Sequence, residues 1–287
     1  MPRVALLLTA LIWGATFPAT KAALEQIPPF SFLFLRFLLG VGLVSLWFVI
    51  AGRRLHRDRA VLIAGLVATV FLFLGYALQT VGLRYTGVSN SAFLTALYVV
   101  FVPLLLRRFE GRVIAATAIA VVGLWLLAKP NASMNIGDLM TIGCAVAFAG
   151  HIVCLERFTR EFDTPSLLVW QMAVVTLLLV PTMWFERPPS AAFAPTGVLL
   201  IGLGVTGGLA TGALALQMWA QQVLPAQQVA LVFASEPAFA AWLAWFFLGE
   251  TLDLQGWLGS ALIVLAVVIG AFQRPSPPPS AEIVPAR

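Results

Sequence analysis

An acidic residue lies deep in an apolar stretch toward the C-terminal end of the chain. The stretch "ALVFASEPAFAAWLAWFFLGE" (230–250) places Glu236 and Pro237 between runs of Ala, Val, Phe, Leu and Trp. A charge in hydrocarbon is costly unless another group compensates it, and a proline inside a helix removes a backbone hydrogen bond. Two interpretations account for the pair. Glu236 lines a cavity, where it binds a cationic group or takes up a proton, or it joins helices by bonding to backbone groups that Pro237 frees.

Two further ionisable side chains lie within apolar stretches, Arg36 in "FLRFLLG" and His151 in "AFAGHIVCLE". Arg36 is the natural partner of Glu236, and the alternative is that its long side chain extends to the outer surface of the membrane that the chain spans. His151 is either a neutral histidine bonded to a neighbouring helix or a proton-linked switch, because histidine titrates near physiological pH. Arg36, His151 and Glu236 are therefore the candidates for an ion pair or for ion coupling.

Aromatic and polar side chains recur at helical spacing in the apolar stretches. Trp13 and Phe17 are four residues apart, and Tyr76 and Gln79 are three apart, so each pair shares one helix face. Polar stripes in membrane helices turn toward a cavity or a neighbouring helix. Helix packing explains any one of these residues, whereas together they predict an amphiphilic pocket suited to a small zwitterion or an aromatic compound. The candidate substrate-binding residues are Trp13, Phe17, Tyr76, Gln79, Thr95, Tyr98, Gln217, Ser235 and Glu236.

The composition indicates that these residues are positioned by helices in a lipid bilayer. The 287 residues are 61% hydrophobic and 10% charged, with a mean hydropathy of +0.97. Soluble domains carry about 25% charged residues. The net charge of +5 does not indicate a nucleic-acid partner, because the basic residues form short clusters between apolar runs. That arrangement is typical of the positive-inside rule.

Ten apolar runs are long enough to cross a bilayer. They lie near 4–24, 30–51, 61–82, 88–106, 113–129, 137–156, 165–185, 196–220, 226–248 and 255–273. Twelve of the seventeen Lys and Arg residues fall on the side of the N-terminus, so both termini are predicted to be cytoplasmic. The proline-rich segment 274–287 is predicted to be a disordered cytoplasmic tail.

A weak internal repeat relates the two halves of the chain at an offset of 135 to 138 residues. It places Trp13 over Phe148, Arg36 over Gln171 and Gln79 over Gln217. The halves, 1–132 and 133–273, hold five spans each, so they must enter the membrane in opposite directions. The predicted fold class is an all-α membrane protein with ten helices in two inverted repeats around a central cavity. Secondary transporters use this arrangement, and a scaffold without transport is the alternative.

Several motifs resemble those of the EamA family of the drug/metabolite transporter superfamily, across nearly the whole chain. These motifs are "LIWGATFPATK", "LRF", "NSAFLTALYVVFVPLL" and "LVFASEPAFAAWLAWFFLGE". The resemblance implies ten helices in two inverted repeats around a central cavity. It also implies transport of amino acids, other metabolites or toxic organic compounds across the bacterial inner membrane, often outward.

The sequence shows no catalytic or nucleotide-binding signature. It contains no HExxH, GxSxG or GxxxxGK[ST] motif, and Cys144 and Cys154 suggest neither a disulfide framework nor a metal site. We therefore predict a secondary transporter rather than an enzyme, with no cofactor or metal and no obligate protein partner, as a monomer or a homodimer. Its expected partners are the lipid bilayer and a small-molecule substrate, which it exports. The alternatives are an importer or exchanger of a similar solute and a non-transporting membrane sensor or assembly subunit.

Overall fold

The computed structural model describes residues 1–128, 134–248 and 253–271, and these residues form helices and connecting turns without a β-strand. In chain order the helices are α1 (Pro2–Ala23), α2 (Pro29–Ile50), α3 (Arg59–Gly82), α4 (Val88–Ala96), α5 (Tyr98–Leu106), α6 (Gly111–Ala128), α7 (Ile136–Glu161), α8 (Thr164–Glu186), the short helix η1 (Ser190–Phe193), α9 (Gly197–Leu203), the π-helix η2 (Gly204–Leu209), α10 (Ala210–Gln221), α11 (Ala226–Phe233), α12 (Glu236–Leu248) and α13 (Leu254–Ala271).

These helices confirm an all-α fold of ten membrane spans. Eight described segments are long and apolar enough to cross a bilayer, and the α11–α12 pair and the shorter α13 complete the set. The fourth span consists of α4 and α5, and the eighth consists of α9, η2 and α10. The predicted span limits agree with the observed helices to within a few residues. The predicted tail at 274–287 lies outside the described residues.

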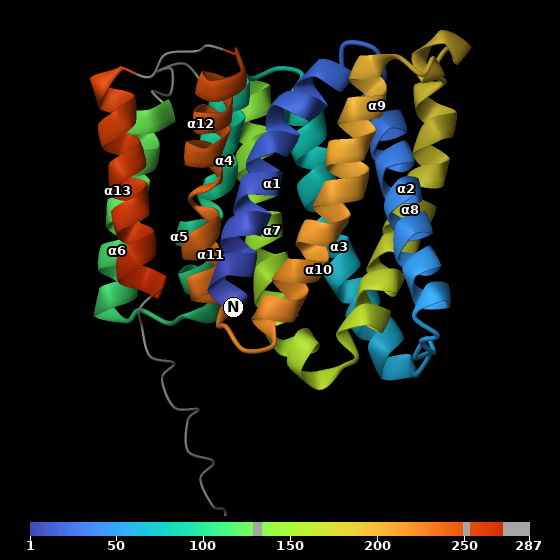
Figure 1. Ribbon diagram of the computed structural model, residues 1–287, viewed down its shortest axis with the longest axis horizontal. Coiled ribbons are helices and arrows are strands. Elements are labelled where there is room, and N and C mark those ends of the chain that lie inside the picture. The colour runs from blue at the N-terminus through green and yellow to red at the C-terminus, as the bar shows by residue number, and fades with distance from the viewer. Residues whose placement is uncertain (129–133, 249–252, 272–287) are drawn as a thin grey trace, which may run out of the picture.

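Helix packing follows the inverted repeat. α2 packs against α8 and α6 packs against α13, at opposite edges of the bundle (Figure 1). α1 packs against α10, and α7 packs against α3. The repeat relates α1 to α7 and relates α3 to the span that includes α10, so the α1–α10 contact is equivalent to the α7–α3 contact. It also relates α2 to α8 and α6 to α13, so each edge pair consists of two equivalent spans. The pseudo-twofold axis therefore passes between the repeats, through the centre of the bundle.

The fourth and ninth spans are both interrupted near their middle. α4 gives way to α5 at Leu97, and α11 gives way to α12 at Ala234 and Ser235. The two interruptions are related by the same 138-residue offset that relates Gln79 to Gln217. In the ninth span Pro237 provides the cause, because it has no N–H and cannot bond to the carbonyl four residues earlier. The fourth span is interrupted without a proline at the equivalent position, Val99.

Buried side chains form two main apolar clusters, one on each side of this axis. One includes side chains of α1, α4, α5, α6, α11 and α13, and the other is built mainly from α2, α3 and α8. Trp13 of α1 and Phe148 of α7 pack against both clusters. These two aromatic residues, which the repeat superimposes on each other, therefore mark the boundary between the two halves of the core.

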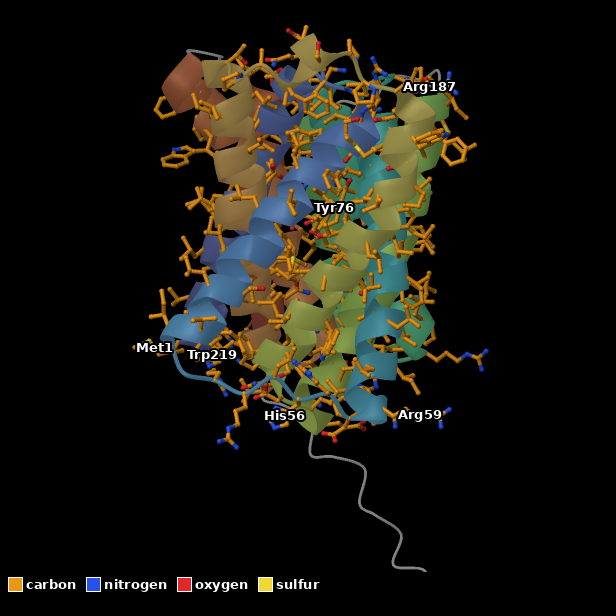
Figure 2. The ribbon with its side chains drawn as sticks, turned by 90° about the vertical axis from the view of Figure 1, so that its right-hand side faces the viewer. Met1, His56, Arg59, Tyr76, Arg187 and Trp219 are labelled. Carbon is orange, nitrogen blue, oxygen red and sulfur yellow. The ribbon has the colours of Figure 1, made fainter. Side chains whose placement is uncertain are left out.

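The ends of the bundle separate the charged loops as the sequence predicts. Met1, His56 and Arg59 lie at one end, Arg187 lies at the other, and Tyr76 lies between them (Figure 2). Residues near Tyr76 are therefore at about the middle of the membrane. That the end with Met1 faces the cytoplasm stays a prediction from the distribution of Lys and Arg.

Candidate functional site

A narrow cavity of about 30 Å³ lies at the centre of the bundle. A water molecule needs roughly 10–15 Å³ measured in this way, so the cavity has room for about two or three waters in this conformation. Its lining consists of Trp13, Thr16, Phe17, Leu72, Tyr76, Gln79, Thr95, Tyr98, Phe148, His151, Ile152, Gln217 and Glu236. Eight of the nine residues proposed from the sequence as substrate-binding are among them.

Glu236 and Tyr98 form the central contact of the cavity. The Tyr98 hydroxyl donates a hydrogen bond of 2.8 Å to Glu236 Oε1, and both side chains are almost fully buried. Each is the first residue of a half-helix, α12 for Glu236 and α5 for Tyr98. The unpaired N–H groups of a helix N-terminus favour a carboxylate, and a proline is tolerated in the first helical turn. The adjacent Glu236 and Pro237 are therefore explained by a helix that begins in the middle of the membrane.

Much of the lining consists of pairs related by the repeat. The offset of 135 residues relates Trp13 to Phe148, Thr16 to His151 and Phe17 to Ile152. The offset of 138 residues relates Gln79 to Gln217 and Tyr98 to Glu236. All ten of these residues line the cavity. The cavity therefore lies on the pseudo-twofold axis, where the two repeats contribute equivalent positions.

His151 is bonded to a neighbouring helix and faces the cavity as well. Its Nε2 lies 2.8 Å from Gln171 Oε1 on α8, and the residue is 2% exposed. The bond to α8 agrees with the structural interpretation of this histidine. The position of His151 on the cavity wall leaves a role in coupling as a proposal.

Two polar atoms of the lining are buried without a hydrogen-bond partner among the described residues, the indole Nε1 of Trp13 and Oε1 of Gln217. The other amide atom of Gln217 donates to Gln221 Oε1 at 2.8 Å, and Gln221 in turn donates to the backbone oxygen of Ile152. An unpaired buried polar group destabilises a fold by about 1–3 kcal/mol. Two residues of the cavity wall thus carry a donor and an acceptor without a described partner in this conformation, beside the carboxyl group of Glu236.

The position of Arg36 contradicts both sequence-based interpretations of this residue, a pair with Glu236 and extension to the membrane surface. Its guanidinium lies 4.0 Å from the centre of the Tyr76 ring, and the residue is 4% exposed. It therefore neither extends to the membrane surface nor forms an ion pair with Glu236 in the described part of the chain. The reason is the packing order of the helices. α2 packs against α3 and α8, whereas α12 packs against α1, α4 and α6. A cation over a desolvated aromatic ring is stabilised by about 2 kcal/mol.

Ser235 is the other sequence-proposed residue that does not line the cavity. Its hydroxyl donates a 2.6 Å bond to the backbone oxygen of Val232, at the interruption of the ninth span. Four lining residues were not proposed from the sequence, and they are Thr16, Leu72, Phe148 and Ile152. The repeat could have identified three of them, since they are the counterparts of His151, Trp13 and Phe17. Leu72 lies one helical turn before Tyr76 and is not distinguished by its residue type.

Sequence comparison matches the description "EamA-like transporter family" twice, over residues 3–128 and 135–271. The chain belongs to the EamA-like transporter family. The two matched ranges coincide with the two groups of five spans. Membership of this family makes the chain a multi-pass membrane transporter.

Relatives of the chain carry similarly general names. An "Uncharacterized transporter" of Archaeoglobus fulgidus is 32% identical over 270 residues, covering 92% of this chain and 83% of that protein. The "Uncharacterized inner membrane transporter YedA" of Escherichia coli K12 is 24% identical, covering 96% and 92% of the two chains. A solved crystal structure matches the fold with a TM-score of 0.76 at 17% identity, over 94% of this chain and 98% of that one.

Polar contacts join the EamA repeats at both ends of the bundle. At the end with His56, Glu156 of α7 lies 3.3 Å from Arg108, which follows α5 in the first repeat, and it also accepts a bond from the backbone N–H of Ala226 within its own repeat. At the opposite end, Asp138 of α7 accepts hydrogen bonds of 2.6 Å from Thr86 and from Asn90. A carboxylate at each end of α7 therefore contacts the fourth span or a loop beside it.

Proposed function

We propose that this EamA-like transporter is a secondary transporter of the bacterial inner membrane that exports a small organic solute, such as an amino acid or a related compound, by alternating access. The observation that carries the proposal is the Tyr98–Glu236 pair. It lies at two helix interruptions on the pseudo-twofold axis and faces the central cavity. Secondary transporters bind their substrates at such discontinuous helices near the membrane midplane.

The chemistry of the lining supports a solute that combines an amine with an apolar or aromatic body. Glu236 is the one carboxyl group among the described lining residues, and no Lys or Arg side chain is among them. A protonated amine is the natural partner of that carboxylate. The rings of Trp13, Phe17 and Phe148 provide apolar contact, and the free atoms of Trp13 and Gln217 provide one donor and one acceptor.

The size of the cavity and the contacts at the two ends support alternating access. A cavity of about 30 Å³ is too small for an amino acid, so binding must be preceded by an opening on one side. Separation of Glu156 from Arg108 and Ala226 would open the end with Met1, and separation of Asp138 from Thr86 and Asn90 would open the other. Glu236 is the proposed site of proton exchange with the substrate amine, and alternating access requires its side chain to be reached from each opening in turn.

The experiment is uptake of pooled radiolabelled amino acids and metabolites into proteoliposomes, with and without an imposed pH gradient. Glu236→Gln is the test variant, and Ser235→Ala is the matched control, because Ser235 is adjacent in sequence but does not line the cavity. Saturable uptake that is lost in Glu236→Gln and retained in Ser235→Ala is the expected result. Unchanged uptake in Glu236→Gln would assign Glu236 to helix packing. Absence of saturable uptake of every pool, by protein shown to be folded, would count against these solute classes.

A further inference from the structure

A second hollow, larger than the central cavity, opens on the lipid-facing surface between α2, α8 and α10. It has a volume of about 390 Å³. Its wall includes Leu43, Trp47, Leu168, Gly212, Ala215 and Trp219. Trp47 and Trp219 are nearly half exposed. Because this surface faces lipid in a membrane, the groove is open to acyl chains of the surrounding bilayer.

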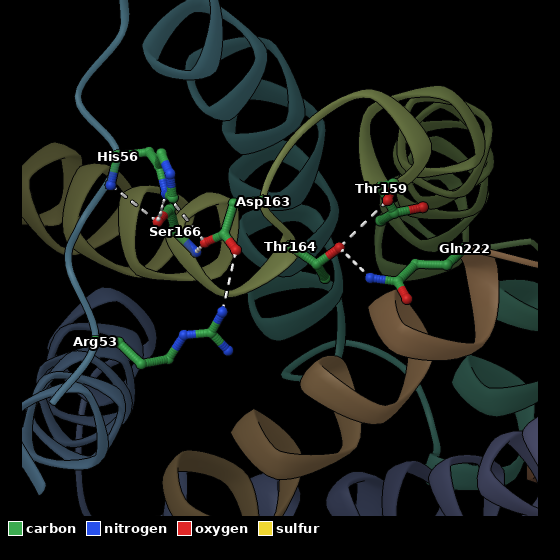
Figure 3. A network of polar contacts seen from close by, with 7 residues as sticks. All are labelled: Arg53, His56, Thr159, Asp163, Thr164, Ser166 and Gln222. Carbon is green, nitrogen blue, oxygen red and sulfur yellow. Dashed lines mark hydrogen bonds and ion pairs between the residues drawn. The ribbon is translucent and has the colours of Figure 1, made fainter. Parts of the chain in front are cut away.

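One end of this groove is polar and lies at the end of the bundle that carries Met1 and His56. Thr164 and Gln222 belong to its wall, and the amide of Gln222 donates a 2.6 Å bond to the Thr164 hydroxyl. The guanidinium of Arg53 lies 5.7 Å from the centre of the Trp47 ring and 3.3 Å from Asp163. Figure 3 shows Arg53 and Gln222 approaching the start of α8 from two sides. The groove therefore has an apolar wall with an amide and a guanidinium at its mouth.

The charge around the mouth is strongly positive. The loop between α2 and α3, with the first residue of α3, carries Arg53, Arg54, Arg57 and Arg59, all exposed, against the single acidic residue Asp58. Arg53 pairs with Asp163 through one nitrogen, and a guanidinium has five N–H donors. Exposed arginines next to a membrane attract anionic lipid headgroups.

We propose that this groove binds one acyl chain of an anionic phospholipid, with the headgroup phosphate held by Arg53 and by the amide of Gln222. The ligand is a bilayer lipid rather than a soluble phosphate, because most of the groove is apolar and faces the membrane. The site is separate from the central cavity and does not depend on the proposed transport function.

The groove can be filled by substitution. A Cβ at Gly212 would have no neighbouring heavy atom within 4 Å apart from its own helix, so Gly212→Leu adds a side chain to the groove wall without a clash at its Cβ. The headgroup contact can be tested separately with Arg53→Gln. Arg57→Gln is the matched control, since it removes the same charge from the same loop. Asp163→Asn breaks the ion pair of Arg53 while leaving its cation in place.

The test is native mass spectrometry of the purified, delipidated full-length chain with added dioleoylphosphatidylglycerol or dioleoylphosphatidylcholine, together with thermal unfolding in the same mixtures. We expect one bound phosphatidylglycerol at concentrations at least five-fold lower than phosphatidylcholine, and a higher Tm with phosphatidylglycerol. Gly212→Leu should abolish this binding, and Arg53→Gln should abolish the preference, whereas Arg57→Gln and Asp163→Asn should retain both. Equal binding of the two lipids, unchanged binding in Gly212→Leu, or an equal loss in Arg57→Gln and Arg53→Gln would overturn the proposal.

Discussion

The two repeats surround the cavity with equivalent membrane spans but with different side-chain chemistry. Thr16 of the first repeat occupies the position of His151 in the second, and Tyr98 occupies the position of Glu236. The amides Gln79 and Gln217 are identical in the two repeats. The histidine and the carboxyl group of the lining therefore both come from the second repeat. This difference indicates that the duplicated scaffold builds the cavity, while the two lining residues proposed for coupling, His151 and Glu236, both belong to the second repeat.

The helix ends show a second difference between the repeats. The N-terminus of α2 is capped by Glu186 of the other repeat, which accepts bonds from the backbone N–H groups of Phe30 and Ser31. The equivalent N-terminus of α8 is capped locally by Asp163, which accepts from the N–H of Ser166. The cap at one end of the bundle thus joins the repeats directly. The cap at the other end connects them through the contact of Asp163 with Arg53.

Substitutions that exchange Tyr98 and Glu236 between the repeats are expected to have the largest effect on transport and stability. Tyr98→Glu places a second carboxyl group against Glu236, and an uncompensated buried charge destabilises a protein by about 3–5 kcal/mol. We expect this variant to lose transport and much of its thermal stability, as measured by uptake and by thermal unfolding in detergent. The double variant with Glu236→Tyr restores one hydroxyl–carboxylate pair and should recover stability and part of the uptake. A folded double variant without any uptake would show that the chemistry of the two positions cannot be exchanged.

A smaller loss is expected where α1 approaches α12. A Cβ on Gly14 would lie 2.8 Å from the backbone oxygen of Glu236, at the start of the interrupted helix. Gly14→Val should therefore lower stability by about 1–3 kcal/mol, as overpacked cores do, and thermal unfolding measures the loss. The equivalent residue of the second repeat is Ala149, which is buried and already carries a Cβ. Ala149→Gly should lose only about 0.5–1 kcal/mol, and an equal loss in both variants would contradict a special close contact at Gly14.

Substitutions of His151 and of its counterpart Thr16 distinguish a structural role of the histidine from a role in proton coupling. His151→Leu leaves Gln171 Oε1 without its partner in α7, which should lower stability by about 1–3 kcal/mol. Thr16→Val should change stability much less, because the Thr16 hydroxyl bonds to its own helix at Trp13. His151→Gln can keep a bond to Gln171, so we expect uptake in this variant to respond to a pH gradient as before. A folded His151→Gln protein whose uptake no longer responds to the gradient would move the coupling site from Glu236 to His151.

The fold was predictable from the sequence because hydropathy is a local signal. Each span needs about 20 apolar residues, and the limits of α2 and α8 follow directly from that pattern. The interruption at Leu97 was not predictable, because neither a proline nor a glycine is present at or immediately beside it. Pro237 provided such a signal in the ninth span.

The candidate site was predictable where helical spacing and the repeat agreed. Trp13 and Phe17 share a face, and so do Tyr76 and Gln79, and all four line the cavity. The partner of Glu236 was not predictable, since Arg36 and Tyr98 both lie in apolar spans and only the packing order of the helices decides between them. That order depends on contacts between residues far apart in the chain, such as the contact of α1 with α12.

The smallest expected effect concerns Asp163, the local cap of α8. Partial burial acts to raise the pKa of Asp163, but the hydrogen bonds from Ser166 and the positive charges of Arg53 and His56 outweigh it, so the pKa lies below its usual value. A depressed pKa stabilises the fold above the pKa of the unfolded chain, and this contribution is lost as the pH falls through the folded pKa. Asn also caps helices well, so Asp163→Asn removes the charge and retains the cap.

Thermal unfolding of Asp163→Asn and of the unsubstituted chain should be compared at several pH values. At neutral pH the variant should be less stable by about 0.5 kcal/mol, the size typical of an exposed ion pair. The difference should disappear at a pH below the folded pKa of Asp163, where the carboxyl group of the unsubstituted chain is protonated as well. A difference that persists unchanged at acidic pH would show that Asn caps α8 less well than Asp. In that case the contact with Arg53 would contribute little to holding the two repeats together.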